Sequence, residues 1–487
     1  MSTHTTNAIV QTSKLIALGD AIRAKTGSSA EMTIDEMATA VANIPTGGGS
    51  VQANVYEGVI FVDYDGSYVD YWAPADVAGK TALPGSPSHT GLTAQGWNWT
   101  LAQIKAQILA YPSMPVWVGQ MYVTASGATE VDISLTDSEF LSPYLGVSIN
   151  GTLTIDWGDN SPTETLSGSS VKSPKYQRHT YQSVGNYTIK LIANGSLGLY
   201  EVSNSYASLL IQSNSTSRKS GRAYSNCVTA IRLGPSVSIG QDAVSSNYSL
   251  RSITIPNDVT SVGTYSFYYC KSLRSITFPN SLTSLGSYTF VGCESLQSIS
   301  IPSEITAIPT RLAQNCYTLP SITIPSGVTS IGDSAFYGCN ALRSLVIPNN
   351  VTSIGTSAVS QSIGLRSVTI PGGITRISDT VFYGCNSLHS ITIPSGVTSI
   401  GRNSLSNLYS VTSITIPAQV TSIGDSAFYN NYSAEEYHFL PTNPPTLGSS
   451  AFSGIVSGTK IYVPSASLSD YKTAANWSSY ASYIVGE

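Results

Sequence analysis

The sequence predicts a modular, mainly β protein whose second half is a repeat solenoid. Three observations support this expectation. The chain has 487 residues, enough for about three domains. Its polar residues are mostly Ser, Thr, Asn and Gly rather than charged, a composition associated with β-rich and loop-rich architectures. Prolines then recur every 23 residues from Pro256 to Pro417, which indicates that one structural unit is repeated along the chain.

The composition also limits the function. Only 10% of the residues are charged and the formal net charge is −5, which argues against nucleic acid as a partner, because its binding needs a basic surface. No window of about 18 residues is wholly apolar, so we expect no membrane insertion. The start, Met1-Ser-Thr-His, lacks the pattern of a secretory leader. We therefore expect a protein that is assembled in a cytoplasm and released by lysis.

Residues 1–46 predict a small helical docking segment. Apolar residues recur at helical spacing from Leu15 onward, and a capping box at Thr33 begins a second helix. Two such helices are too small to fold alone, and residues 47–50 (Gly-Gly-Gly-Ser) are typical of a flexible linker. The stretch 15–44 resembles an N-terminal segment of phage and prophage tail proteins. This resemblance implies that residues 1–46 bind other virion or tail proteins.

Residues 51–114 predict a β-rich module. Asp65-Gly66 lies between apolar runs, which is the pattern of a β-hairpin. Asp63, Asp65 and Asp70 are candidate ligands for a calcium loop, but the complete ligand series and its distal Glu are absent, so we expect no metal. The module resembles segments beside the helical hairpin in phage structural proteins.

Residues 115–195 predict a β-sandwich, and residues 196–226 a connector. Trp157-Gly158-Asp159-Asn160 is typical of a turn after a strand with a buried Trp. Together with His179-Thr180-Tyr181, this motif resembles a polycystic-kidney-disease-type (PKD-like) domain, which implies a spacer or binding module. The Asn of the first motif stands where that family has Gly, and Asn also tolerates a positive φ. We interpret the His of the second motif as a structural residue rather than a base.

Residues 227–440 predict a solenoid of 23-residue units, closed by a C-terminal capping region at 441–487. Each unit has a short strand, a proline and a turn. A lone unit buries too little apolar surface to offset the entropy of ordering its residues. Stacked units share one apolar column, so the solenoid needs caps at its ends. Lys460 to Pro464 predicts the final strand, and a polar helical segment with Tyr471 and Trp477 supplies the cap.

The repeat pattern, Ser-Ile-Thr-Ile-Pro-x-x-Val-Thr-Ser-Ile-Gly-x-x-Ala-Phe-x-x-Cys-x-x-Leu, resembles the BspA-like class of bacterial leucine-rich repeats. The unit at 320–342 follows this pattern almost letter for letter. The resemblance implies a curved solenoid with a parallel sheet along its concave side. It also implies adhesion and surface binding rather than catalysis.

Five of the six cysteines occupy one position of the repeat: Cys270, Cys293, Cys316, Cys339 and Cys385. The candidate explanations are a disulfide ladder, a metal stripe, or small buried thiols that stack in the core. Zinc spacing of the Cys-x-x-Cys kind is absent, and Ser362 and Leu408 fill the same position in other units. We therefore expect free, buried thiols and no cofactor.

The candidate binding site is a ladder of hydroxyls on the strand face of the solenoid. Side chains alternate across a strand, so the Ser and Thr on either side of each inward Ile should point outward, spaced about 4.8 Å from coil to coil. Such an uncharged face can exchange hydrogen bonds with a glycan or a protein; the alternative is that the hydroxyls only solvate a flat sheet. The predicted site residues are Ser252, Thr254, Ser275, Thr277, Ser298, Ser300, Ser321, Thr323, Ser344, Ser367, Thr369, Ser390, Thr392, Ser413 and Thr415.

The sequence contains no recognisable catalytic constellation, so we expect no enzyme. The histidines are few and scattered, and no His-Glu-x-x-His, Gly-x-Ser-x-Gly or phosphate-binding loop occurs. Paired-acid glycosidase chemistry stays an alternative, because two such acids can be distant along the chain. Glu435-Glu436 is an adjacent acidic pair, and solvation of a turn explains it.

These features predict a phage or prophage tail or fibre-like virion protein whose solenoid binds a glycan or protein of the host surface. Two alternatives stay open: a bacterial surface adhesin exported by a non-Sec route, and an architectural virion decoration protein without a receptor. A homo-oligomer is a further possibility, although no coiled-coil heptad supports it.

Overall fold

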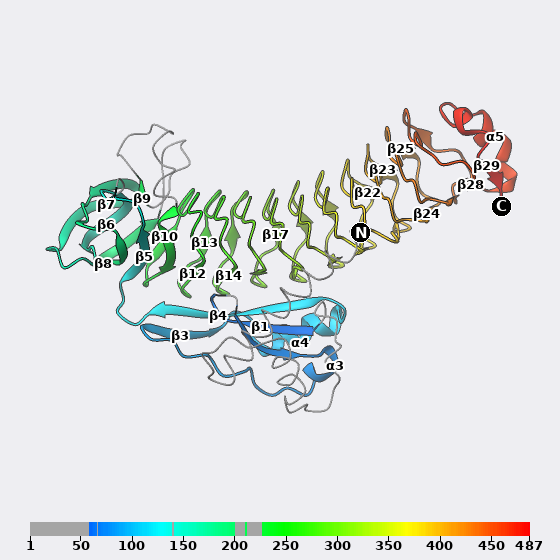
Figure 1. Cartoon of the computed structure of the whole chain (residues 1–487). Helices are drawn as coiled ribbons and strands as arrows, with labels where there is room; N and C mark the ends of the chain where they lie inside the picture. Colours follow the sequence, from blue (N-terminus) through cyan, green and yellow to red (C-terminus); the bar gives the residue numbers. More distant parts are fainter. Residues whose placement is uncertain (1–57, 66, 139–140, 200–209, 212–225) are drawn as a thin grey trace, which may run out of the picture. The chain divides into compact units, whose positions relative to one another are not determined.

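The computed structural model describes residues 58–65, 67–138, 141–199, 210–211 and 226–487, all of which lie in one compact unit of the chain (Figure 1). The helical segment expected at 1–46, the linker at 47–50 and most of the connector at 196–226 lie outside the described residues. The described part is mainly β, as the sequence predicts. Within that part, no helix combines the length and the apolar character needed to cross a membrane.

Four strands form a small sheet near the start of the described chain: β1 (Gly58–Val62), β2 (Tyr68–Trp72), β3 (Leu92–Trp97) and β4 (Pro115–Thr124). Their order in the sheet is β2–β1–β4–β3. β1 and β2 form the antiparallel hairpin that the sequence predicts, whereas β4 lies parallel to β1 and antiparallel to β3. The expected domain boundary before residue 115 is corrected, because β4 belongs to this sheet. We call residues 58–124 the N-terminal module.

Two helices pack on one face of the N-terminal module, α3 (Pro74–Val77) and α4 (Leu101–Ala110). Val116 and Val118 of β4 lie in the apolar core that this face shares with the helices. Because side chains alternate along a strand, Trp117 points to the opposite face of the sheet.

The next four strands are long: β5 (Thr129–Leu135), β6 (Tyr144–Asp156), β7 (Glu164–Arg178) and β8 (Gly185–Leu199). A short strand, β9 (Leu210–Ile211), pairs with β6. Trp157 and Tyr181 are buried among these strands, and Asn160 has a φ of 64°, in the region that the sequence analysis allowed for it.

The sheet of β5 and β8 continues directly into the solenoid. β5 pairs with β10 (Val228–Arg232) and β8 pairs with β11 (Val237–Ile239), which are the two strands of the first coil. One apolar core extends from Val131 of β5 to Ile484 near the C-terminus. The β5–β8 region therefore caps the N-terminal end of the solenoid.

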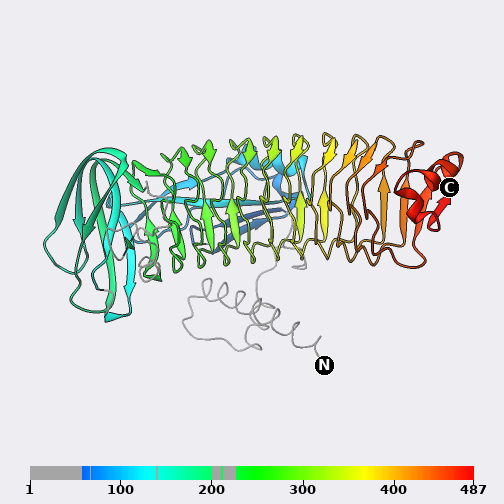
Figure 2. The ribbon, with the colours of Figure 1, turned by 90° about the horizontal axis from the view of Figure 1, so that it is seen from above.

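The solenoid has two rows of short parallel strands around its core (Figure 2). The first row after β10 is β12 (Ser252–Thr254), β14 (Ser275–Thr277), β16 (Ser298–Ser300), β19 (Ser344–Val346), β21 (Ser367–Thr369), β24 (Ser413–Ile416), β26 (Glu436–Phe439) and β28 (Lys460–Val463). The second row after β11 is β13 (Ser261–Val262), β15 (Ser284–Leu285), β17 (Ala307–Ile308), β18 (Ser330–Ile331), β20 (Ser353–Ile354), β22 (Arg376–Ile377), β23 (Ser399–Ile400), β25 (Ser422–Ile423) and β27 (Thr446–Leu447). Residues one repeat apart pair, as Ser275 does with Ser298, so the predicted 23-residue unit is one coil.

The remaining side of each coil consists of turns in which two residues have a left-handed backbone. Tyr288 (φ 62°) and Gly292 (φ 70°) hold these two positions in one coil. A bulky residue such as Tyr adopts this conformation only where its surroundings hold it there. Here the next coil does so, because Tyr288 N–H donates to Thr310 O (2.9 Å) and Gly292 N–H donates to Gln314 O (2.8 Å).

The cysteine column is buried and its thiols are free, which confirms the expectation of stacked thiols. Each thiol donates to a carbonyl of the preceding coil, as Cys293 Sγ does to Phe267 O (3.1 Å). Ser362 and Asn431, in the same column, make the corresponding bonds to Phe336 O (2.8 Å) and Leu405 O (2.9 Å). Seven of the eight residues at this position from Cys270 to Asn431, all except Leu408, thus donate a side-chain hydrogen bond to the preceding coil. Burial raises the pKa of the Cys385 thiol to about 12, so it stays protonated.

The C-terminal cap is formed by η3 (Ser465–Ser467), α5 (Leu468–Thr473), η4 (Trp477–Tyr480) and β29 (Ile484–Gly486). Tyr471 and Trp477 are buried, as the sequence predicts, and their polar atoms donate to Pro441 O and Pro445 O (2.8 Å each). β29 pairs with β28, so the expected final strand at 460–464 is followed by one more.

Candidate functional site

The predicted hydroxyl ladder lies on the outer face of the first strand row. The register pairs Ser275 with Ser298 and Thr277 with Ser300, while the intervening Ile276 and Ile299 are buried in the core. The expected alignment of hydroxyls from coil to coil is therefore confirmed for these strands. We call this surface the strand face.

The first part of the strand face is not open to solvent. Six hydroxyl residues of three successive coils are at most 4% exposed: Ser275, Thr277, Ser298, Ser300, Ser321 and Thr323. The N-terminal module covers them, and β4 runs across the three coils (Figure 1). We call these three coils the covered half. The expectation that these six residues offer a free binding surface is corrected, because the chain itself occupies it.

Four hydrogen bonds join β4 to hydroxyls of the covered half, and three of them use the β4 backbone. Trp117 N–H donates to Thr323 Oγ1 (3.1 Å), and Thr323 Oγ1 donates to Pro115 O (2.5 Å). One coil away, Ser300 Oγ donates to Trp117 O (2.7 Å). The Trp117 indole adds a side-chain contact by donating to Ser321 Oγ (2.9 Å). Hydroxyls of two adjacent coils thus hold the main chain of an extended strand.

At the third coil, β4 passes directly over a threonine. A Cβ at Gly119 would overlap both the hydroxyl and the methyl group of Thr277, so only glycine fits at this point. The Thr277 hydroxyl is buried and has no hydrogen-bond partner within the described chain. Nearby, Ser275 Oγ donates to Tyr64 O (3.0 Å). The absence of a side chain at residue 119 therefore allows the module to lie this close to the solenoid.

Side chains of the segment before and within α4 extend the interface. Asn98 donates to Ser300 Oγ (2.6 Å) and Phe278 O (3.1 Å), and it accepts from Gly119 N (2.9 Å). Gln103 accepts from Thr100 N–H in the capping box of α4 and also donates to Ser303 Oγ (2.6 Å). One uncharged side chain therefore both begins the helix and binds the solenoid.

Sequence reasoning gave these module residues no role at the ladder. A signal for β4 nevertheless exists, because Val116, Trp117 and Val118 are apolar on both alternations of the strand. A strand that is apolar on both sides is typical of burial on both faces. No comparable signal marks Asn98 or Gln103, whose partners lie about two hundred residues away along the chain.

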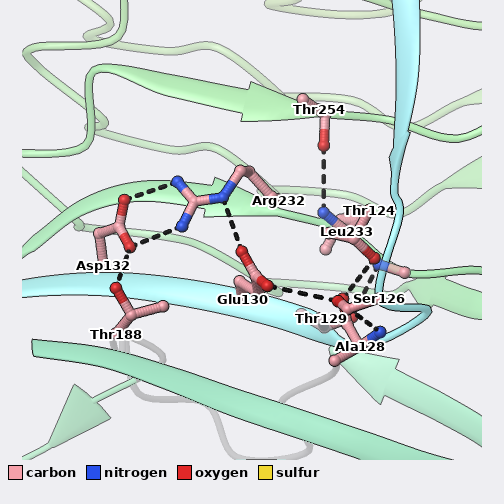
Figure 3. Close-up of polar contacts among 11 residues, drawn as sticks. Thr124, Ser126, Ala128, Thr129, Glu130, Asp132, Thr188, Arg232, Leu233 and Thr254 are labelled. Atoms are coloured by element: carbon pink, nitrogen blue, oxygen red, sulfur yellow. Dashed lines mark hydrogen bonds and ion pairs between the residues drawn. The ribbon is translucent and has the colours of Figure 1, made fainter. Parts of the chain in front are cut away.

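A charged network holds the first coil to the sheet of β5 and β8 (Figure 3). Arg232 donates to both carboxylate oxygens of Asp132 (2.6 and 2.7 Å) and, through Nε, to Glu130 (3.0 Å). Burial alone would raise the pKa of the Asp132 carboxyl, but the hydrogen bonds from Arg232 and Thr188 outweigh it and hold the pKa below its ordinary value.

The end of β4 joins the same junction (Figure 3). Thr124 N–H donates to Leu233 O (3.4 Å), and Leu233 N–H donates to Thr254 Oγ1 (3.1 Å). Thr254, which the sequence placed in the ladder, is therefore buried and engaged inside the molecule, and Ser252 beside it is half-buried. The second coil, to which Ser252 and Thr254 belong, is thus not fully open either, and the N-terminal module is anchored by the bond of Thr124 to Leu233 of the first coil.

The later coils leave the strand face open. The exposed hydroxyl residues are Ser367, Thr369, Ser390, Thr392, Ser413 and Thr415. We call these three coils the open half. Between the two halves, Ser344 and Val346 are half-buried, and Val346 interrupts the hydroxyl column.

One histidine, His438, lies at the C-terminal end of the open half and contacts two glutamates and a tyrosine. His438 is in register with Thr415 and Tyr462, and its ring stacks on that of Tyr462 (4.9 Å between centroids). Its Nε2 lies 3.1 Å from Glu436 Oε2 and its Nδ1 lies 3.0 Å from Glu487 Oε2. Partial burial lowers the pKa of His438, but the hydrogen bonds to Glu436 and Glu487 outweigh this and raise it above its ordinary value.

The aspartates and the histidine that the sequence singled out are paired locally. The three aspartates considered for calcium have separate partners: Asp63 binds His89 (2.6 Å), Asp65 binds Ser67 N, and Asp70 binds Trp72 Nε1. His179 binds Asp159 (2.8 Å) and stacks on the Trp157 ring, so it is structural as predicted. Among the described residues, no group of three or more His, Cys, Asp or Glu is placed to hold a metal ion.

Stacked 23-residue coils with two rows of parallel strands around one apolar core define a leucine-rich-repeat solenoid. The family model of the BspA type leucine-rich repeat region matches this chain in six copies, over residues 237–366 and 358–480, which is half of the chain. The chain belongs to this family.

Solved structures that are similar to the chain are leucine-rich-repeat proteins. One is from Bacteroides ovatus (25% identity, TM-score 0.36; 52% of this chain and 69% of that chain covered). Another is from T. pallidum (28% identity, TM-score 0.32; 38% and 83% covered). A third is described as a leucine-rich cell surface protein of Faecalibacterium prausnitzii (20% identity, TM-score 0.26; 57% and 92% covered). No curated protein matches the chain.

Proposed function

We propose that this chain is a phage or prophage tail-type virion protein, and that the open half of its strand face attaches the particle to the host cell surface. The role is binding without catalysis. The N-terminal segment, residues 1–46, joins the chain to other virion proteins.

The exposure of the open half carries this proposal. Three adjacent coils present uncharged hydroxyls, and each hydroxyl can both donate and accept a hydrogen bond. The corresponding hydroxyls of the covered half bind β4 of the same chain, which supports the view that such hydroxyls can form a binding surface. The attachment to a virion rests on the resemblance of residues 15–44, and of the module that follows them, to phage structural proteins.

Adsorption to cells tests the role of the open half. We expect the purified full chain to adsorb to the bacterial strain on which the particles grow, and to compete with the particles for it. Replacing Thr369, Thr392 and Thr415 by Glu should reduce adsorption at least tenfold. The matched control replaces Thr375, Thr398 and Thr421 by Glu, because these exposed threonines lie in the same coils beside the second strand row. Equal adsorption of the two triple variants would contradict the proposal.

Virion assembly tests the other half of the proposal. A chain without residues 1–46 should be absent from purified particles. Its incorporation at the normal level would show that the segment is not the virion attachment. Recovery of the intact chain from washed cells without prophage induction would favour the bacterial surface adhesin instead.

A further inference from the structure

We infer that the open half binds an extended polypeptide segment of a partner protein, which lies across the coils as β4 lies across the covered half. The inference rests on the proposed function and deepens it, because it names the chemical class of the ligand. It follows from four features: the hydrogen bonds to β4, the repetition of the coils, the close approach at Gly119, and the charged residues at the end of the ladder.

The covered half shows what kind of ligand the ladder accepts. Three of its hydrogen bonds to β4 use main-chain atoms of Trp117 and Pro115, and a fourth contact, from Ser275, uses the main-chain oxygen of Tyr64. Main-chain groups are present in every extended polypeptide, so these contacts do not depend on the ligand's side chains. Hydroxyls that act as donor in one bond and acceptor in the next match a strand, which offers both kinds of group.

The open half repeats the groups that hold β4. Thr369, Thr392 and Thr415 lie four repeats after Thr277, Ser300 and Thr323, respectively, with the same 23-residue coil between successive members. The neighbouring column repeats as well, because Ser367, Ser390 and Ser413 correspond to Ser275, Ser298 and Ser321. A strand placed on the open half in the register of β4 therefore meets a hydroxyl at every position that β4 uses.

The geometry also specifies one residue of the ligand. β4 clears the Thr277 side chain only because residue 119 is glycine. Thr369 occupies the corresponding position in the open half, so the ligand needs a glycine where it crosses that coil.

The far end of the open half adds a preference for charge. The coil after Thr323 places Val346 in the hydroxyl column, whereas the coil after Thr415 places His438 there, between Glu436 and Glu487. β4 runs from the coil of Thr323 toward that of Thr277, so its N-terminal side corresponds to the His438 end. In a ligand strand with the direction and register of β4, a basic residue about two positions before the one that corresponds to Pro115 would therefore lie near the carboxylates of Glu436 and Glu487.

A labelled peptide tests the inference on the full chain. The probe has the sequence of residues 113–124 with Ser113→Lys, and its binding is measured by fluorescence anisotropy. We expect saturable binding that weakens at least tenfold when Thr369, Thr392 and Thr415 are replaced by Glu. The Thr375, Thr398 and Thr421 control should bind the peptide as the unmodified chain does. A peptide that also carries Gly119→Val should bind at least tenfold more weakly, and one with Ser113→Glu at least threefold more weakly.

The outcomes separate this inference from the proposed function. Absence of saturable peptide binding, or equal peptide binding by the open-half variant and its control, overturns the polypeptide ligand. If the open-half variant nevertheless loses adsorption to cells, the proposed function stands and the ligand is of another class, such as a neutral polysaccharide. If the peptide binds as expected but adsorption is unchanged, the polypeptide site stands and the host-binding role falls.

Discussion

The covered and open halves of the strand face have almost the same side chains and opposite surroundings. In the covered half, Thr323 is 1% exposed and bonded to β4, whereas Thr415, four repeats later in the same column, is exposed. The difference does not come from the coils. It comes from the reach of the N-terminal module, whose hydrogen bonds to the solenoid, among the described residues, begin at Leu233 of the first coil and end at Asn349.

The comparison shows why a ladder of hydroxyls suits both surroundings. An exposed hydroxyl is solvated, and a buried one costs little as long as it is hydrogen-bonded. A ladder of lysines or glutamates would be compatible with solvent alone, because burial of an unpaired charge is strongly unfavourable. One repeat sequence can therefore serve as an internal interface in three coils and as an open surface in three others.

The largest expected contrast between the halves comes from introducing a charge. Thr323→Glu should destabilise the docked module by about 3–5 kcal/mol, because the carboxylate would be buried without a partner. Thr415→Glu should change stability by less than about 0.5 kcal/mol, because the same position is exposed there. Thermal unfolding of the two variants measures the difference. Equal melting curves would show that the covered half is open in solution.

The close approach at Gly119 gives the next effect. Gly119→Val should destabilise docking by about 1–3 kcal/mol, because the side chain would overlap Thr277. Gly85→Val is the control within the same module, since a Cβ at Gly85 meets nothing within 4 Å. Hydrogen exchange should show loss of amide protection in the covered half for the first variant only. Unchanged protection in Gly119→Val would mean that β4 does not lie on Thr277.

An effect of similar size should distinguish two hydroxyls within the covered half. Thr323→Val removes the acceptor of Trp117 N–H and the donor to Pro115 O, so it should cost about 1–3 kcal/mol. Thr277→Val should be nearly neutral, because its hydroxyl has no partner within the described chain. Chemical denaturation of the two isosteric variants makes the comparison. A larger cost for Thr277→Val would reverse the assignment of hydrogen bonds at the interface.

The solenoid was predictable because its 23-residue unit is repeated eight times in the sequence. Pro256 and its successors fix the period, and the period together with strand alternation places each Ile inward and each Ser or Thr outward. The free cysteine column was predictable for the same reason. The burial of Trp157 also followed from a local motif.

The occlusion of the ladder was not predictable, because it depends on contacts between distant segments. Trp117 and Thr323 lie 206 residues apart along the chain. Nothing in the sequence of the hydroxyl column or of β4 indicates that the two bind each other. The repeat would instead predict that all coils are equally exposed, since the coils of the two halves have nearly the same sequence. Only the apolar character of β4 on both faces indicated that the strand needed a second covering surface.

The smallest expected effect belongs to the far end of the open half and depends on pH. The pKa of His438 is raised in the folded chain by Glu436 and Glu487, so its protonated form contributes stability. That contribution is complete below the unfolded pKa of about 6.5 and is lost as the pH rises through the higher folded pKa. The free energy of unfolding of the unmodified chain should therefore exceed that of the His438→Gln variant at about pH 6, and the two should approach each other at about pH 8. Glu436→Gln should lower the pKa of His438 in an NMR titration, and a titration that this substitution leaves unchanged would mean that Glu436 does not contact the ring. The coil that follows the covered half has Val346 in the corresponding column, so this pH dependence should be confined to the open end of the strand face.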